Sequence, residues 1–212
     1  MKPLIVANWK CNPAGYREAK RLFAEVKNLR AVICPPFVYL SLFFRGRRKC
    51  ALGAQDCFWA EKGAYTGEIS PLMLKDLGVE YVILGHSERR KLQQEASGLI
   101  QKKLKAVLKA GLRPIVCIDK ISQIPKKIKG EYILAYEPLF AIGTGKPCSI
   151  EKAKKMRLLI REKVKVPVLY GGSVNSLNAA DYIKQAGFDG LLVGSASLKP
   201  KEFIQLVKNA TI

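Results

Sequence analysis

The chain contains one histidine, His86, which lies where an apolar stretch gives way to a polar segment. In Leu84-Gly85-His86-Ser87-Glu88-Arg89-Arg90 the imidazole follows an expected strand and lies beside the amides of an expected helix start. Glu137 occupies a similar boundary in Tyr136-Glu137-Pro138. Imidazole and carboxylate groups are the usual proton carriers in enzymes. The two segments together predict proton-transfer chemistry on an anionic substrate.

A loop of small residues, 139–146, follows Glu137. The chain carries a formal net charge of +20. In a chain this rich in lysine, the more common role of a glutamate is to pair with a surface lysine. The position of Glu137 at a strand end, together with the hinge-like run Gly143-Thr144-Gly145, instead favours a catalytic base beneath a moving lid.

Two glycine-containing segments are candidates for holding an anion. Gly171-Gly172-Ser173 and Gly194-Ser195 each follow an apolar run, where backbone amides can approach a phosphate closely. Glycine pairs alone are weak evidence, because ordinary turns also use them. Lys10 follows the first apolar run and supplies a fixed positive charge, and Asn8 can orient that lysine or an oxyanion.

Eight apolar runs of strand length recur along the chain, with helical patterns between them. The runs are nearly continuous in apolar residues, which is typical of parallel strands that are covered on both faces. Repeated strand–helix units without a break in composition predict one (β/α)8 TIM barrel domain over residues 1–212, with an open doubly wound sheet as the alternative. In the barrel, every candidate residue above lies at the carboxyl end of a strand. The expected strands are 4–7, 31–34, 51–54, 81–84, 114–118, 132–136, 167–170 and 190–193.

The six cysteines show no Cys-x-x-Cys spacing, and with a single histidine they make a poor zinc set. We interpret them as reduced thiols. Cys34 and Cys117 lie within apolar runs and are expected to be small core residues. No apolar segment reaches the length of a signal sequence or a membrane span, so we expect a cytoplasmic protein with no membrane segment.

The formal net charge of +20 favours polyanions such as nucleic acid through nonspecific attraction. The lysines, however, are spread along the expected helices. Between Gln101 and Lys109 they alternate with an apolar face, which predicts a solvated helix surface. No nucleic-acid motif accompanies them. A catalytically impaired protein with a polyanion-binding role stays the alternative from a different class of function.

At these candidate segments the chain closely resembles the triosephosphate isomerase family. The combination of Tyr136-Glu137-Pro138 with Gly85-His86-Ser87-Glu88 argues against another phosphate-binding barrel such as a sugar-phosphate epimerase. The similar blocks occur in family order from end to end. They are Ala7-Asn8-Trp9-Lys10-Cys11-Asn12, Gly53-Ala54-Gln55, Gly63-Ala64-Tyr65-Thr66-Gly67-Glu68-Ile69-Ser70, Gly85-His86-Ser87-Glu88-Arg89-Arg90, Ala135-Tyr136-Glu137-Pro138, Ala141-Ile142-Gly143-Thr144-Gly145-Lys146, Tyr170-Gly171-Gly172-Ser173-Val174-Asn175 and Leu192-Val193-Gly194-Ser195-Ala196-Ser197-Leu198.

The resemblance implies an isomerase of glycolysis and gluconeogenesis, without metal or cofactor, that interconverts dihydroxyacetone phosphate and D-glyceraldehyde 3-phosphate through an enediol(ate). Glu137 would remove and return the proton on carbon. His86 would polarise the carbonyl and move protons between the two oxygens. Lys10 would stabilise negative charge with Asn8 beside it, and Glu88 matches a further active-site carboxylate.

The resemblance also implies how substrate and subunits are held. Loop 63–68, around Thr66, would insert into a second subunit of a homodimer, and a tetramer is the alternative because short enzymes of this family form tetramers. The implied substrate-binding residues are Asn8, Lys10, Gly143, Ser173, Gly194 and Ser195, the last four through backbone amides.

The chain departs from the family pattern in several places. It is shorter than the ~250 residues typical of such barrels, and the largest shortage falls between Cys117 and Tyr132, so we expect the fifth helix to be vestigial or missing. Asp119-Lys120 stands where the family has glycine and glutamate. Phe140 replaces a tryptophan in the lid, and Ser195 replaces the second glycine of the last pair.

Overall fold

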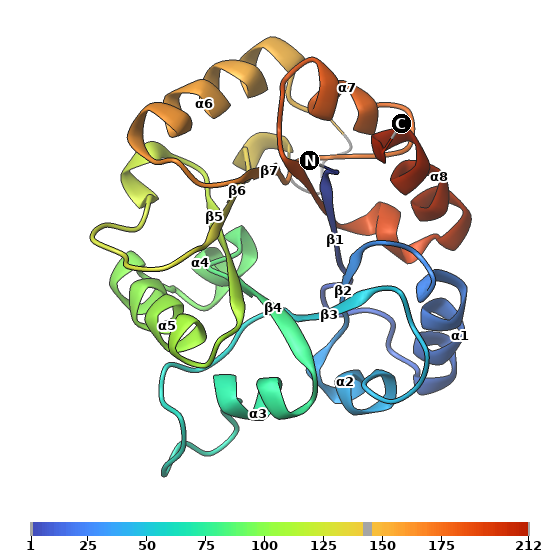
Figure 1. Ribbon diagram of the computed structural model, residues 1–212, viewed down its shortest axis with the longest axis vertical. Coiled ribbons are helices and arrows are strands. Elements are labelled where there is room, and N and C mark those ends of the chain that lie inside the picture. The colour runs from blue at the N-terminus through green and yellow to red at the C-terminus, as the bar shows by residue number, and fades with distance from the viewer. Residues whose placement is uncertain (1, 142–145, 212) are drawn as a thin grey trace.

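Eight parallel strands close into a barrel in chain order, so that β1 pairs with β8 as well as with β2. The computed structural model describes residues 2–141 and 146–211, and Figure 1 shows its helices arranged around the ring of strands. The predicted (β/α)8 barrel is confirmed. The strands are β1 (Leu4–Asn8), β2 (Val32–Cys34), β3 (Ala51–Ala54), β4 (Val79–Leu84), β5 (Arg113–Ile118), β6 (Ile133–Tyr136), β7 (Val168–Tyr170) and β8 (Gly190–Val193).

Helical segments follow the strands and cover the outside of the barrel. Ser70 caps one of them, α3 (Pro71–Asp76), because its Oγ accepts a hydrogen bond from the Met73 amide at 3.2 Å. Among the described residues no helix is long and apolar enough to cross a membrane. The helices are α1 (Tyr16–Val26), α2 (Phe37–Phe43), α3 (Pro71–Asp76), α4 (Ser87–Leu92), α5 (Ser97–Lys109), α6 (Ile150–Lys163), α7 (Ala179–Lys184) and α8 (Pro200–Thr211), with 3-10 turns η1 (Ile121–Gln123), η2 (Leu139–Ala141) and η3 (Ser195–Leu198).

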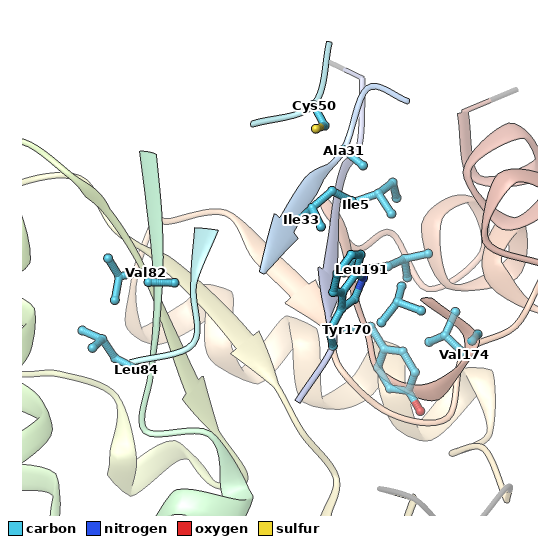
Figure 2. Packing of buried hydrophobic residues seen from close by; sticks show 14 of the residues in the cluster. Ile5, Ala31, Ile33, Cys50, Val82, Leu84, Tyr170, Val174 and Leu191 are labelled. Carbon is cyan, nitrogen blue, oxygen red and sulfur yellow. The ribbon is translucent and has the colours of Figure 1, made fainter. Parts of the chain in front are cut away.

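Strand side chains alternate between the barrel interior and the helix layer, as the two-residue period of a strand requires. In β1, Val6 belongs to a cluster made only of strand residues, whereas Ile5 belongs to a larger cluster shared with the helices. Figure 2 shows part of the larger cluster, with Ile5 and Ile33 contributed by neighbouring strands. Cys34 and Cys117 are buried inside the barrel, as predicted, and burial raises the pKa of both thiols.

The connection between β5 and β6, where the sequence predicts a vestigial or missing fifth helix, contains only the turn η1 among its helical elements. Pro125 follows Ile124, whose ψ of 125° is extended. A residue that precedes proline is disfavoured in helical conformation, so the chain cannot continue the turn into a helix. Figure 1 shows the connection as a yellow-green loop between α5 and α6.

Apolar contacts hold this connection to the rest of the barrel. Ile121, Ile124 and Ile128 are partly buried and pack against the larger core cluster. The Gln101 side chain of α5 adds a hydrogen bond, donating from Nε2 to the Lys126 carbonyl at 3.0 Å. The side of the barrel that lacks a helix is therefore closed by isoleucines.

One lysine of α5 is not part of the solvated surface that the sequence predicts. Lys103 is 4% exposed, and its Nζ lies 2.7 Å from Asp56 Oδ2 and 2.6 Å from Glu95 Oε1. Arg89 contacts the same two carboxylates, each at 2.8 Å. The prediction was wrong here because charge alone assigns a lysine to water, whereas the fold brings two carboxylates against this face of the helix.

Candidate active site

Most of the predicted site residues line a single cavity of about 680 Å³ at the carboxyl end of the strands. Glu88 lies on an adjoining cavity, which it shares with Glu137. Gly143 falls outside the described residues. The predicted residues that line the larger cavity come from β1, β4, β6, β7 and β8 and the segments that follow them: Asn8, Lys10, His86, Glu137, Ser173, Gly194 and Ser195.

The carboxylate of Glu137 is 2% exposed and is held by two groups of the segment that follows β4. Its Oε2 accepts a hydrogen bond from the Ser87 amide at 2.9 Å, and its Oε1 lies 3.1 Å from His86 Nε2. The strand ends of β4 and β6 thus bring the predicted base and the predicted electrophile into direct contact.

The hydrogen bonds of His86 define where its ring proton lies. The Glu88 amide donates to Nδ1 at 3.2 Å, because His86 is the N-cap residue of α4. An accepting nitrogen carries a lone pair, so the ring proton lies on Nε2 and points to Glu137. A neutral imidazole in this tautomer can donate a hydrogen bond from Nε2 to a substrate oxygen.

Lys10 is fixed at its backbone and at its side chain. Its φ of 55° lies in the left-handed region, which costs a non-glycine residue roughly 1–3 kcal/mol and persists only where the surroundings hold it. Asn8 Oδ1 accepts from the Lys10 amide at 3.0 Å, and Gln55 Nε2 donates to the Lys10 carbonyl at 2.8 Å. Its Nζ lies 2.5 Å from Glu88 Oε1. The ammonium group is thereby directed to the barrel mouth.

Two of the predicted phosphate-loop glycines also make room for the reactive side chains. A Cβ on Gly171 would lie 3.0 Å from Glu137 Cγ, and a Cβ on Gly194 would lie 3.3 Å from Lys10 Cε. Both distances are too short for ordinary van der Waals contact. Glycine at these two positions therefore leaves room for the side chains of Glu137 and Lys10, in addition to letting backbone amides approach a phosphate.

The two ends of loop 139–146 are tied to β7 and its following loop. Ser173 Oγ donates to the Ala141 carbonyl at 2.5 Å, and the Cys148 amide donates to Tyr170 Oη at 3.2 Å. Tyr182 Oη of α7 donates to the Cys148 carbonyl at 2.5 Å. The flanks of the loop are therefore anchored on the β7 side of the cavity.

Sequence reasoning missed three residues that the fold brings to the site. Cys117 was interpreted only as core, yet its pKa is raised by burial and further by the neighbouring Glu137 carboxylate. Asn178 and Glu202 line the larger cavity with no motif to single them out. The one usable signal was the position of Cys117 close to the carboxyl end of its strand.

The family model of triosephosphate isomerase matches residues 3–210 of the chain. The triosephosphate isomerase of Alkaliphilus oremlandii is 41% identical over 245 aligned positions, which cover 97% of this chain and 98% of that protein. That of Aquifex aeolicus is 39% identical over 246 positions, covering 98% and 99%, and that of Dictyoglomus turgidum is 38% identical over 247 positions with the same coverage. These alignments are longer than the 212 residues of the chain, so the relatives contain residues that it lacks. The chain belongs to the triosephosphate isomerase family.

Proposed function

We propose that this protein interconverts dihydroxyacetone phosphate and D-glyceraldehyde 3-phosphate, as an isomerase of glycolysis and gluconeogenesis. The observation that carries the proposal is the contact of a buried carboxylate, Glu137 Oε1, with His86 Nε2 at 3.1 Å. A base and a hydrogen-bond donor so placed can act on two adjacent carbons of one small substrate.

The proposed reaction moves protons only. Glu137 takes a proton from the hydroxyl-bearing carbon of dihydroxyacetone phosphate, while His86 Nε2–H donates to the carbonyl oxygen, which gives an enediol. His86 then removes the proton of the other hydroxyl oxygen, and Glu137 returns its proton to the former carbonyl carbon. The number of protons and electrons is conserved, so these steps need no redox cofactor.

The remaining site residues bind and stabilise charge. Lys10 supplies the positive charge opposite the enediolate oxygens, Asn8 fixes the Lys10 amide, and Glu88 holds the ammonium group. Backbone amides of Ser173, Gly194 and Ser195 are proposed to bind the phosphate, together with the amide of Gly143. The cavity can hold the whole triose phosphate and exclude water when loop 139–146 covers it.

The activity is tested by a coupled assay in both directions, with the purified wild-type protein. We expect kcat/KM to approach the diffusional ceiling of about 10⁸ M⁻¹s⁻¹. In deuterium oxide, a carbon-bound hydrogen of the product should exchange with solvent, because a carboxylate base shares its proton with water. Full retention of the original hydrogen would show that the transferred hydrogen does not exchange with water, and would contradict this expectation.

A homodimer in the cytoplasm is proposed as the working form. The segment around Thr66 projects beyond the ring of helices in Figure 1, drawn in teal between β3 and α3. It carries Trp59 and Tyr65, which are 37% and 46% exposed, and such aromatic surface supports association with a second copy. Sedimentation distinguishes a dimer from a tetramer, and an active protein that stays monomeric would contradict both.

A further inference from the structure

We propose that Glu202, assisted by Asn209, is a positioning residue that fixes the loop after β7 so that the Ser173 amide faces the substrate phosphate. Both residues belong to α8, which contributes none of the predicted site residues. The inference rests on the proposed phosphate-binding role of Ser173, and its test separates the two.

The polar groups of Ser176 are all taken by α8. Glu202 Oε1 accepts from the Ser176 amide at 2.6 Å, and Glu202 Oε2 lies 3.0 Å from Ser176 Oγ. Asn209 Nδ2 donates to the Ser176 carbonyl at 2.8 Å. Glu202 and Asn209 are two helical turns apart and therefore lie on one face of α8. Ser176 is 9% exposed, so water competes little for these bonds.

Two asparagines carry this constraint from Ser176 to Ser173. Asn175 Oδ1 accepts from the Leu177 and Asn178 amides at 2.9 and 3.1 Å, which closes the turn around Ser176. Asn178 Nδ2 then donates to the Ser173 carbonyl at 3.2 Å. A continuous set of hydrogen bonds therefore runs from α8 to the residue whose amide is the proposed phosphate donor.

The negative charge of Glu202 needs an explanation, because this residue lies on the proposed phosphate-binding cavity. Glu202 lines the same cavity as Ser173 and Gly194, where a carboxylate would repel a phosphate dianion. Its two oxygens are instead directed at the amide and hydroxyl of Ser176, and a carboxylate accepts stronger hydrogen bonds than a neutral group. Since an amide that moves by about 1 Å loses much of its interaction with a bound ligand, a fixed loop preserves phosphate affinity.

The test compares Glu202→Ala and the nearly isosteric Glu202→Gln with wild type and with Glu18→Ala. Glu18 is an exposed glutamate in the first turn of α1, as Glu202 is in the first turn of α8, so the control removes the same charge from an equivalent helix position. Calorimetric titration with inorganic phosphate at fixed salt measures the dianion site without turnover. Rates with D-glyceraldehyde 3-phosphate and with unphosphorylated D-glyceraldehyde measure catalysis with and without that site.

We expect Glu202→Ala to bind inorganic phosphate about tenfold more weakly, a loss of about 1.4 kcal/mol. Glu202→Gln, which keeps one accepting oxygen, should lose less, and Glu18→Ala should match wild type. KM for the phosphorylated substrate should rise, while kcat/KM for D-glyceraldehyde stays unchanged. Phosphate affinity equal to wild type in the folded Glu202 variants would overturn the inference, and so would an equal loss of kcat/KM for both substrates. If the wild type has no isomerase activity but the loss of phosphate affinity is found, the inference stands and the proposed function falls.

Discussion

The loop after β7 and the connection after β5 leave the same end of the barrel but are held in different ways. In the β7 loop, side chains of α8 bind the amide, hydroxyl and carbonyl of Ser176. In the β5 connection, Ile121, Ile124 and Ile128 pack against the core and one side-chain hydrogen bond reaches the Lys126 carbonyl. Directional bonds hold the first segment, and mainly apolar contact holds the second.

The difference fits the role that we propose for each segment. An amide that binds an anion must point in one direction, and hydrogen bonds fix direction because they weaken steeply away from linear geometry. A segment that only covers a strand must exclude water, and hydrophobic burial does this without fixing orientation. The chain can therefore lack a helix between β5 and β6 while the anchoring of the β7 loop is kept.

The largest effect is expected at Glu137, which directly follows β6. Glu137→Gln should lower kcat about 10³-fold, because an amide cannot accept the proton from carbon. Glu131 is exposed and lies two residues before β6, and the matched change Glu131→Gln should leave kcat unaltered. Steady-state assays of both variants measure the effect, and a fall of less than tenfold in Glu137→Gln would show that another group is the base.

A loss of stability is expected when Lys103, the buried lysine of α5, is replaced. Lys103→Met leaves Asp56 and Glu95 with Arg89 as their one remaining cation contact among the described residues, so the free energy of unfolding should fall by about 3 kcal/mol. Denaturant unfolding at pH 7 measures it, with the exposed Lys105→Met as control. A variant as stable as the control would show that the cluster adds nothing.

The stability of Lys103→Met should also depend on pH more strongly than that of wild type. Burial raises the pKa of Asp56 to about 6, although Lys103 opposes this shift, and without Lys103 the pKa should rise further. A carboxyl whose folded-state pKa exceeds its unfolded-state value destabilises the fold once it ionises. Stability of Lys103→Met should therefore decrease as pH rises from 5 to 7 more than in wild type, which unfolding curves at the two pH values compare.

A smaller effect is expected where apolar contact replaces the helix. Ile124→Ala should lower the free energy of unfolding by about 1 kcal/mol, because the side chain is only partly buried, and should leave kcat unchanged. Chemical denaturation and the coupled assay measure the two quantities in one preparation. A marked fall in kcat would mean that this connection also positions site residues, and the contrast with the β7 loop would fail.

The smallest effect is expected in the lid segment, where Phe140 is 61% exposed. Phe140→Trp restores the indole of the family pattern while keeping an aromatic ring. We predict a change in kcat of less than tenfold, or less than about 1.4 kcal/mol. A larger change would show that the indole donor has a role in this chain that the phenyl ring does not fill.

The sequence predicted the strands and the residues that gather at their ends well, because continuous apolar runs and their polar boundaries are local signals. It did not predict the environment of Lys103, whose partners Asp56 and Glu95 lie on other segments. Cys117 was predicted to be buried, but its neighbour Glu137 could not be read from spacing. The role of Glu202 depends on a contact between α8 and a loop twenty-six residues earlier in the chain, which no pattern encodes.

The pairing of β1 with β8 constrains the order in which the protein can mature during synthesis. β1 leaves the ribosome long before its partner β8, because pairs such as Leu4 with Gly190 join residues that are far apart in the chain. Until then β1 has a bare edge that is open to wrong pairing. Asn8 and Lys10 are carried by this strand and the turn after it, so the cavity they share with Gly194 is completed only after β8 has emerged. A nascent chain that stalls before β8 would therefore have an unpaired β1 edge that is open to wrong pairing, and it would lack a complete cavity.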